Sequence, residues 1–438
     1  MAFKIGLLGY GTVGTGTAEI ILDPEGRNSL LQEIEIAKVG VRSLDQPRSP
    51  QLPTGVLTTD LEAIVNDPEI KIVVELLGGL EPARSLILQA IAKGKHIVTA
   101  NKAVIARHGE EIFTAANQAE VYVLFEAAVG GGIPVIKPLK QSLGVNRIET
   151  VIGIINGTTN YILTQMTEEG ADFEEVLAEA QQLGYAEADP TADVDGYDAA
   201  DKIAILAAIA FNGRIKREDI SCEGIRQINA TDISYADDLG FVIKLLAIAK
   251  RGRSPIAKAN TDNDSLQVRV HPTLVSKDHP LANVNGVYNA ILVEGYPLGQ
   301  VMLFGPGAGK GATASAVVSD IVNIIGFLQT SNTTRKLDPM LKCPHDHFKQ
   351  LTPIAEINTR FYARFLCQDV PGVIGHLGTS FGNHDVSLES VVQIGFRNNL
   401  AEIVVVTHNV QEGNFRKALE EIKSLASIDS IPSILRVL

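Results

Sequence analysis

Residues 6–16 read GLLGYGTVGTG, and this stretch decides the fold of the first part of the chain. It carries the spacing G-x-G-x-x-G at Gly9, Gly11 and Gly14, after a short apolar run and before a helical pattern. In that context the first glycine permits a tight turn, the second lets the backbone approach a pyrophosphate, and the third lets a helix pack closely on a strand. The N–H groups of the helix N-terminus then face the phosphates. The stretch therefore predicts a dinucleotide-binding unit.

Strand and helix patterns alternate from this motif to about residue 130. The apolar runs FKIGLLG, EIAKVGV, KIVVELL, KHIVTA and VYVLFEA are separated by helical patterns such as EPARSLILQAIAKG. This alternation predicts an α/β domain with a doubly wound, mostly parallel sheet of Rossmann type. We expect this domain over residues 1–130, completed by a helix within 305–328.

The pattern changes after residue 130. Strand signals such as SLQVRVHPTLV stand beside amphipathic and apolar helices, so we expect an α+β domain for substrate binding and dimerisation over 131–304. Residues 329–358 are polar and contain prolines, as in a linker. Residues 359–438 read β-α-β-β-α-β, the order of a ferredoxin-like domain.

Composition excludes several classes of protein. The net charge of −13 argues against nucleic acid as a partner. No apolar run in the sequence is expected to approach the roughly 18 residues of a membrane span. The three cysteines are odd in number and far apart, which suits a reducing compartment, and the first residues enter a strand at once. We expect a cytoplasmic protein that does not associate with a membrane.

The second strand indicates which dinucleotide binds. It ends at Arg42 and Ser43, where a site specific for NAD would carry an acidic residue. Because arginine can pair with a 2′-phosphate, we favour NADP, with NAD also accepted. The run GPGAGKGAT at 305–313 is not a P-loop, since Phe304 and Gly311 occupy positions that the motif needs. The residues expected to bind the cofactor are Gly9, Gly11, Thr12, Val13, Gly14, Arg42, Lys102, Gly184 and Gly305.

A lysine behind several carboxylates indicates the chemistry. In GYAEADPTADVDGYDAADK, residues 184–202, Asp198 and Lys202 are four apart and share a helix face. The simple alternative is an exposed ion pair worth a few tenths of a kcal/mol. The helix is apolar beyond this turn, however, and a dehydrogenase needs a general acid for its carbonyl oxygen. Lys102 follows a strand end, where open α/β sheets bind ligands.

Seven motifs together resemble homoserine dehydrogenase over residues 3 to about 325. They are GLLGYGTVG, VVELLGG, TANKA, EAAVGGGIP, GIINGTTNYIL, GYAEADPTADVDGYDAADK and GPGAGKGATASAVVSD. The resemblance implies reduction of L-aspartate 4-semialdehyde to L-homoserine with NAD(P)H, in threonine, methionine and isoleucine synthesis. It makes Lys202 the proton donor and Lys102 the second lysine of the site. It also implies that Glu187 and Asp198 bind substrate, with Asp193 nearby.

FEAAVGGGIP, residues 125–134, is similar to the monovalent cation site of that family. The resemblance implies sodium held by the Glu126 carboxylate and the carbonyls of Val129, Gly131 and Ile133, and oxygen ligands suit such a hard cation. From the residues alone the run is equally a turn between domains. INGTTN, residues 155–160, reads as a helix start capped by a threonine, Thr158 or Thr159.

The tail resembles an ACT domain through DVPGVIGHLGTSFGNHDVSLESV, residues 369–391. The resemblance implies feedback control by an amino acid, with threonine favoured, although a domain that only dimerises is the alternative. We expect a homo-oligomer, either a dimer or a tetramer. Cys343, His345 and His347 of CPHDH lack a fourth clustered ligand, so we expect no metal there.

Two alternatives to this function remain. Another NAD(P)-dependent amino-acid dehydrogenase would use the same cofactor but would not turn over aspartate semialdehyde. A non-catalytic amino-acid sensor would have lost its site lysines, and both Lys102 and Lys202 are present.

Overall fold

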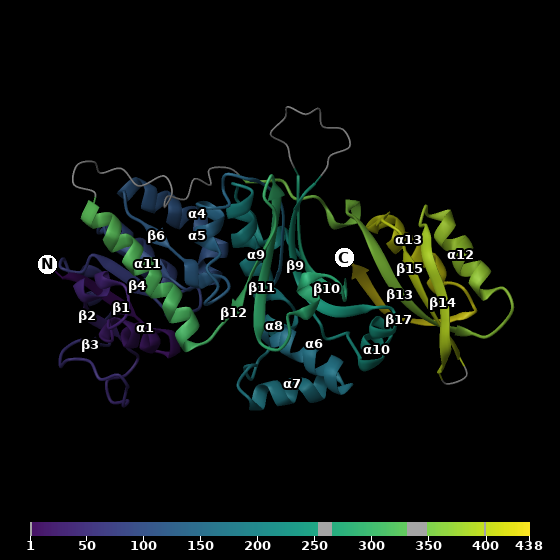
Figure 1. Cartoon of the computed structure of the whole chain (residues 1–438), viewed down its shortest axis with the longest axis horizontal. Helices are drawn as coiled ribbons and strands as arrows, with labels where there is room; N and C mark the ends of the chain where they lie inside the picture. The colour runs from purple at the N-terminus through teal and green to yellow at the C-terminus, as the bar shows by residue number, and fades with distance from the viewer. Residues whose placement is uncertain (1, 253–264, 331–347, 398–399) are drawn as a thin grey trace. The chain divides into compact units, whose positions relative to one another are not determined.

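The computed structural model describes residues 2–252, 265–330, 348–397 and 400–438 (Figure 1). These residues form two compact units, and each unit is assembled from three stretches of the chain. The first unit takes Met1–Val151, Asp201–Asp219 and Tyr288–Lys349, and the second takes Ile152–Ala200, Ile220–Val287 and Gln350–Leu438. Cys343, His345 and His347 lie outside the described residues, as does most of the expected linker.

The first unit is built on a six-stranded sheet with parallel pairing throughout. The strands are β1 (Phe3–Leu8), β2 (Ile34–Gly40), β3 (Leu57–Thr58), β4 (Ile72–Glu75), β5 (His96–Thr99) and β6 (Val123–Leu124). Their order is β3-β2-β1-β4-β5-β6, so the direction of winding reverses between β1 and β4. Ligands bind at the carboxyl ends of the strands at such a switch point. The Rossmann prediction is confirmed.

The helices of this unit begin where the sequence supplies caps. They are α1 (Thr12–Leu22), α2 (Leu61–Asn66), α3 (Ala83–Ala92), α4 (Lys102–Ala119), α5 (Ile136–Lys140) and α11 (Lys310–Thr330), with short 3₁₀ turns η1 (Ser29–Glu33) and η2 (Glu126–Ala128). The Asp60 carboxylate accepts the Ala63 N–H at the start of α2, and Asn101 accepts the Val104 N–H at the start of α4. Each cap satisfies an N–H group that the helix leaves unpaired.

Helix α11 corrects the expectation that no run approaches a membrane span. Its residues Lys310–Gln329 are long and apolar enough to pass that test by length and composition. Val317, Ile321 and Ile324, however, are completely buried in one cluster with strand residues such as Leu7 and Val74. The helix is apolar because its buried residues contribute to the core of the first unit.

A hairpin of β11 (Tyr288–Tyr296) and β12 (Gly299–Pro306) also belongs to the first unit. Its rings of Tyr288 and Phe304 stack at 5.2 Å between centroids, and both side chains are exposed. Strand β7 (Arg147–Ile154) and helix α9 (Tyr197–Ala210) each run through a boundary between the units.

The second unit begins with a helical layer and a long hairpin. Its helices are α6 (Gly157–Glu169), α7 (Phe173–Gln182), α8 (Thr191–Val194) and α10 (Ala230–Asp238), and its strands include β8 (Ser221–Cys222), β9 (Phe241–Arg251) and β10 (Leu266–Ser276). Strands β9 and β10 pair antiparallel along their whole length. Strand β9 was not predicted from the sequence. Its run FVIKLLAIAKR is almost continuously buried, so no alternation of polar and apolar residues marked it as a strand.

The C-terminal stretch folds as β-α-β-β-α-β, as predicted. The elements are β13 (Asn358–Gln368), α12 (Val373–Asn383), β14 (Leu388–Arg397), β15 (Leu400–Thr407), the short β16 (Val410–Gln411), α13 (Glu412–Lys423) and β17 (Ile428–Val437), with a 3₁₀ turn η5 (Ile354–Glu356) in front. The strand order is β17-β13-β15-β14. Stacked rings of Phe361 and Phe415, 3.9 Å apart, lie in its core.

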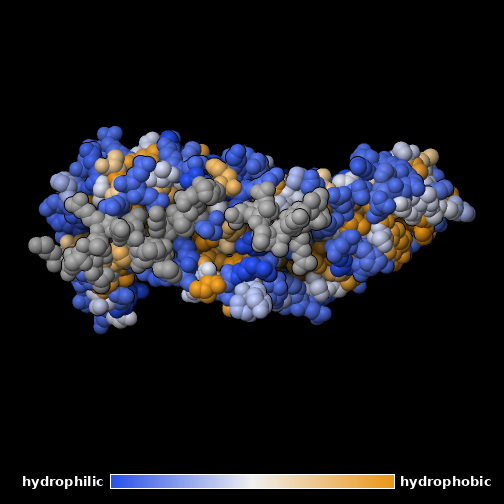
Figure 2. Space-filling view, turned by 90° about the horizontal axis from the view of Figure 1, so that it is seen from above, coloured by the Kyte–Doolittle hydropathy of each residue, from blue (hydrophilic) through white to orange (hydrophobic). Residues whose placement is uncertain are grey.

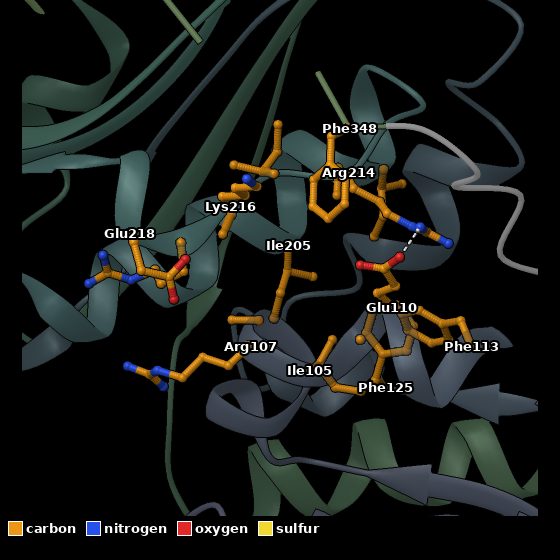
Figure 3. Close-up of a pocket in the computed structure, with 17 residues that line it drawn as sticks. Ile105, Arg107, Glu110, Phe113, Phe125, Ile205, Arg214, Lys216, Glu218 and Phe348 are labelled. Atoms are coloured by element: carbon orange, nitrogen blue, oxygen red, sulfur yellow. Dashed lines mark hydrogen bonds and ion pairs between the residues drawn. The ribbon is translucent and has the colours of Figure 1, made fainter. Parts of the chain in front are cut away.

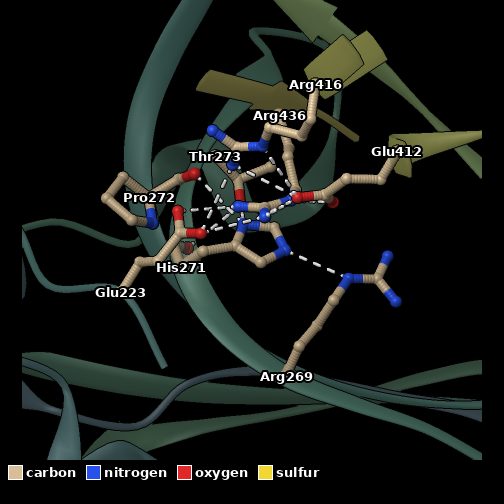
Figure 4. A network of polar contacts seen from close by, with 8 residues as sticks. All are labelled: Glu223, Arg269, His271, Pro272, Thr273, Glu412, Arg416 and Arg436. Atoms are coloured by element: carbon tan, nitrogen blue, oxygen red, sulfur yellow. Dashed lines mark hydrogen bonds and ion pairs between the residues drawn. The ribbon is translucent and has the colours of Figure 1, made fainter. Parts of the chain in front are cut away.

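A buried polar network joins this stretch to the rest of the second unit (Figure 4). Arg436 of β17 donates to both carboxylate oxygens of Glu223, at 2.8 and 2.9 Å, and to Glu412 of α13. Nearby, Arg269 donates to Nε2 of His271 at 3.1 Å. Because burial lowers the pKa of His271 well below its usual value, the ring is neutral and Nε2 can accept this bond.

Candidate active site

The glycine loop after β1 has the shape that the motif predicted. Gly9 has φ of +113°, which favours glycine, and a Cβ there would press on the carbonyl of Leu76. A Cβ on Gly14 would overlap the carbonyl oxygen of Gly9, so the third glycine sets the close approach of α1 to the loop. A Cβ on Gly11 would meet nothing within 4 Å, and Thr12 beside it is exposed. The loop therefore leaves open space at its second glycine.

Basic residues stand near this loop, after β2. Arg42 is exposed two residues after the strand ends. Arg48 folds back on the same loop and donates to the carbonyl oxygen of Ser43. Tyr10, within the glycine loop, donates its hydroxyl to Pro50 at 3.0 Å. Arg42 was predicted from the sequence and Arg48 was not, because only the folded loop brings residue 48 back to residue 43.

The glycine-rich turn at 305–309 leads into α11 and lies beside α1. Gly305 pairs with Asn289 across the β11–β12 hairpin. A Cβ on Gly307 would overlap the Asn289 side chain, so this position has no room for a larger residue. Lys310 begins α11 and forms an ion pair of 2.5 Å with Glu19 of α1. Gly184 ends α7 with φ of +76°, as predicted for a helix stop.

Lys102 is the first residue of α4, directly after the carboxyl end of β5. A buried network fixes this helix start: Thr99 donates to Glu75 at 2.7 Å, and Asn101 donates to the carbonyl of Gly79 at 2.7 Å. Burial is the largest influence on Glu75, and it raises the pKa of that carboxyl. Glu75 stands in the VVELLGG motif. Its contact with Thr99, just before the cap of α4, could not be predicted from the sequence, because it depends on the pairing of β4 with β5.

Two of the predicted substrate carboxylates meet at one amide. Asn156 donates from Nδ2 to Asp193 at 2.7 Å and to Asp198 at 2.9 Å. Asn156 and Asp198 are buried, and Asp193 is partly buried. Lys202 is also buried and follows Asp198 by one turn of α9. Glu187 is exposed in the segment after α7, where its backbone carbonyl accepts a bond from Gln181.

Asn156 was missed as a site residue, and the predicted threonine cap was wrong. The side chain that caps α6 belongs to Asn156, which accepts the Thr159 N–H at 2.8 Å. Thr158 instead donates to the carbonyl of Tyr185 at 2.6 Å. Asparagine is among the best N-cap residues, and this signal in INGTTN could have identified it.

The carboxylate of Glu126 has a structural role in the first unit. Its two oxygens accept the N–H groups of Val135, Ile136 and Lys137 at 2.6–2.8 Å, which closes the first turn of α5. The Glu126 N–H donates to Asp320, whose pKa is raised to about 8 by burial and by the charge of Glu126. Within the described residues, no three His, Cys, Asp or Glu side chains gather as a metal cluster.

Comparison with known proteins identifies the family. Family profiles match residues 9–126 as the NAD-binding domain of homoserine dehydrogenase, 134–322 as homoserine dehydrogenase and 361–427 as an ACT domain. The chain is 69% identical to homoserine dehydrogenase of Synechocystis over 100% of both chains. The chain belongs to the homoserine dehydrogenase family. Its activity is therefore the NAD(P)-dependent interconversion of L-homoserine and L-aspartate 4-semialdehyde.

Solved structures of homoserine dehydrogenases agree with this assignment. The enzyme of Thiobacillus denitrificans is 42% identical, covers 100% of this chain and 98% of its own, and has a TM-score of 0.89. A hyperthermophilic archaeal homoserine dehydrogenase in complex with NADPH is 27% identical and covers 76% of this chain and 100% of its own, with a TM-score of 0.61. A nicotinamide cofactor thus belongs to this enzyme, and its ACT domain implies an amino-acid effector.

Proposed function

We propose that Lys202 holds the proton that passes to the carbonyl oxygen of L-aspartate 4-semialdehyde, with Lys102 as the second lysine of the site. The reduced nicotinamide supplies the hydride when it is bound. Asp198 and Glu187 bind the substrate ammonium group, and Asp193 orients the site. The observation that carries the proposal is the amide of Asn156, which donates to Asp193 of α8 and to Asp198 of α9. Asp198 lies one helical turn before Lys202.

The test is homoserine oxidation by purified Lys202→Ala. A positioned general acid or base contributes about 10²–10⁴-fold, so turnover should fall by that factor while cofactor binding, followed by fluorescence titration, is kept. The exposed Lys216→Ala is the matched control and should keep its turnover. A Lys202→Ala enzyme with unchanged turnover would show that the Asp198–Lys202 pair is only an ion pair.

We propose NADP as the preferred cofactor. The support is the exposed Arg42 after β2, with Arg48 folded back on the same loop. The other residues of the proposed cofactor site are the three motif glycines together with Thr12, Val13, Gly184, Lys102 and Gly305. Arg42→Ala should reduce kcat/KM for NADP about tenfold and leave that for NAD unchanged, because only NADP carries the 2′-phosphate. Equal losses for both cofactors would contradict the preference.

We propose that the loop from Glu126 to Ile133 binds sodium. Gly130 and Gly131 have positive φ, which turns this loop tightly, and the carbonyls of Val129, Gly131 and Ile133 would supply neutral oxygens suited to a hard cation. The Glu126 carboxylate already accepts three N–H groups. We propose that it attracts the ion by its negative charge as well as by direct coordination. Replacing sodium with tetramethylammonium should lower turnover, and sodium should restore it in a saturable way.

We propose threonine as the effector, a homo-oligomer as the assembly and the cytoplasm as the location. Threonine at millimolar concentration should suppress homoserine oxidation; if it does not, the tail senses another amino acid or only dimerises. Among the residues coloured by hydropathy in Figure 2, hydrophilic ones predominate and apolar ones emerge in separate patches. Exposed Tyr288, Met302 and Phe304 on the β11–β12 hairpin support an interface, which sedimentation of Phe304→Glu would test.

We also propose the domain limits expected from the sequence: 1–130 with 305–328 for the cofactor, 131–304 for the substrate and dimerisation, 329–358 as linker and 359–438 as regulatory domain. Limited proteolysis should cut first within 329–358. A first cut inside 131–304 would contradict this division.

A further inference from the structure

Asp201, the residue before Lys202, is a buried carboxylate held by two arginines. Its Oδ2 accepts from Nη1 of Arg107 at 3.0 Å, and its Oδ1 accepts from Nε of Arg217 at 2.7 Å. The Asp201 side chain is 7% exposed, against 11% for Arg217 and 33% for Arg107. All three residues lie in the first unit. Asp201 is not among the site residues predicted from the sequence.

The two arginines act at different ranges along the chain. Arg217 and Asp201 belong to one continuous stretch, since α9 ends at Ala210 and Arg217 follows in the next turn. Their pair therefore ties α9 to its own continuation. Arg107 comes from the second turn of α4, the helix whose first residue is Lys102. The Arg107–Asp201 pair thus links the helix that carries Lys102 to the helix that carries Lys202.

Apolar packing between these helices is incomplete, which gives the ion pair more influence. A cavity of about 400 Å³ lies between α4, α9 and residues 214–218 (Figure 3). Ile105 and Phe113 of α4 line one side, and Ile205 and Ile209 of α9 line another. Among the residues that the structure describes, the two helices thus leave space that a packed interface would fill, so apolar contacts restrain their relative placement less there.

We propose that Arg107 is a positioning residue for the reaction, acting through Asp201 to set the placement of α9, and so of Lys202, against α4 and Lys102. It touches neither substrate nor cofactor in this scheme. The inference rests on the roles of the two lysines given under Proposed function. A misplacement of about 1 Å in a reacting group can cost about a hundredfold in rate, so a bond between the two helices can control turnover.

The experiment compares Arg107→Met with Glu110→Gln. Glu110 is also on α4, lines the same cavity, and forms an ion pair with Arg214 after α9 (Figure 3). That ion pair does not involve Asp201. We expect kcat to fall 10- to 100-fold in Arg107→Met, while KM for the cofactor stays within twofold. Glu110→Gln should keep kcat. Arg107→Lys, which keeps the charge, should recover part of the rate.

A double-mutant cycle separates positioning from loss of folding. If Arg107 acts through Asp201, the kcat of Arg107→Met/Asp201→Asn should be no lower than that of the worse single variant. Melting temperatures of the variants measure stability separately. Multiplicative losses, or a kcat of Arg107→Met equal to that of Glu110→Gln, would overturn the inference. A fully active Lys202→Ala would instead refute the proposed function, so the two failures are distinguishable.

Discussion

Asn156 performs two tasks that a pair of substitutions can separate. Its side-chain oxygen Oδ1 accepts the Thr159 N–H and caps α6, and its side-chain Nδ2 donates to Asp193 and Asp198. Asn156→Ser keeps a capping oxygen but removes the amide donor. Because a hydrogen bond to a charged group contributes about 1.5–3 kcal/mol, we expect kcat/KM for homoserine to fall roughly 10- to 100-fold with little change in melting temperature.

Asn156→Ala is the comparison for that prediction. It loses the cap as well as the donor, so its kinetic loss should match that of Asn156→Ser while its stability falls by a further ~1 kcal/mol. Steady-state kinetics and thermal melting of both variants give the answer. If Asn156→Ser bound homoserine as the wild-type enzyme does, the amide would have no part in the substrate site.

At the residue scale the sequence revealed contacts that are local in the chain. The spacing of Asp198 and Lys202 follows from helix periodicity, and both side chains are buried, as the apolar helix suggested. Asn156 is 42 residues from Asp198, and Arg107 is 94 residues from Asp201. No periodicity connects such positions, because only the packing of separate helices brings them together.

The glycine loop and α1 allow a matched test at the scale of one element. Gly11→Ala adds a methyl group to open space, so the fold should be kept while the KM for the cofactor rises, because the backbone approaches the pyrophosphate there. Gly14→Ala drives the same methyl group into the carbonyl of Gly9 and should lower stability by about 1–3 kcal/mol. Thermal melting and cofactor titration distinguish the two. Equal melting temperatures would contradict the reading of the third glycine.

Strand β5 carries a histidine whose titration should appear in acid stability. Burial lowers the pKa of His96 to about 4, and its Nδ1 accepts the Tyr122 N–H at 2.9 Å. Below its unfolded pKa of about 6.5 the unfolded chain takes up a proton that the folded chain refuses, so stability falls from pH 6.5 towards pH 4. In His96→Gln this fall should shrink by on the order of 2 kcal/mol. Melting curves from pH 4 to pH 8 test it, with the exposed His376→Gln as the control.

At the element scale, short apolar strands that alternate with helix patterns were predictable even where they are buried, as β4 is, and the long buried strand β9 was not. Five of the six Rossmann strands alternate with helix patterns, so their places along the chain followed from the sequence, whereas the two-residue β3 was not predicted. Strand β9 is buried along most of its length and reads equally as a helix, since the burial comes from neighbours elsewhere in the chain.

The C-terminal domain is built into the second unit. Strand β17 pairs with β10 in parallel, at Thr273 with Arg436 and at Leu274 with Val437. Arg364 of β13 is fully buried and donates to Asp232 of α10 at 2.9 Å and to Glu402 of β15 at 2.6 Å. The sequence predicted the domain and its element order. The contacts with β10 and α10, however, join residues more than a hundred positions apart, which no local pattern connects.

Removing the C-terminal domain should therefore destabilise the enzyme as well as deregulate it. A chain ending at residue 357 lacks Arg364, so Asp232 loses the arginine with which it pairs. Burial raises the pKa of Asp232, which shows that its charged form is already costly in this place. Breaking a buried ion pair costs about 3–5 kcal/mol. In the full chain, Arg364→Met should melt several degrees lower, and adding Asp232→Asn should restore part of the loss because it removes the unpaired charge. A truncated enzyme that stayed soluble, melted cooperatively and kept full turnover would show that the domain is only an appended sensor.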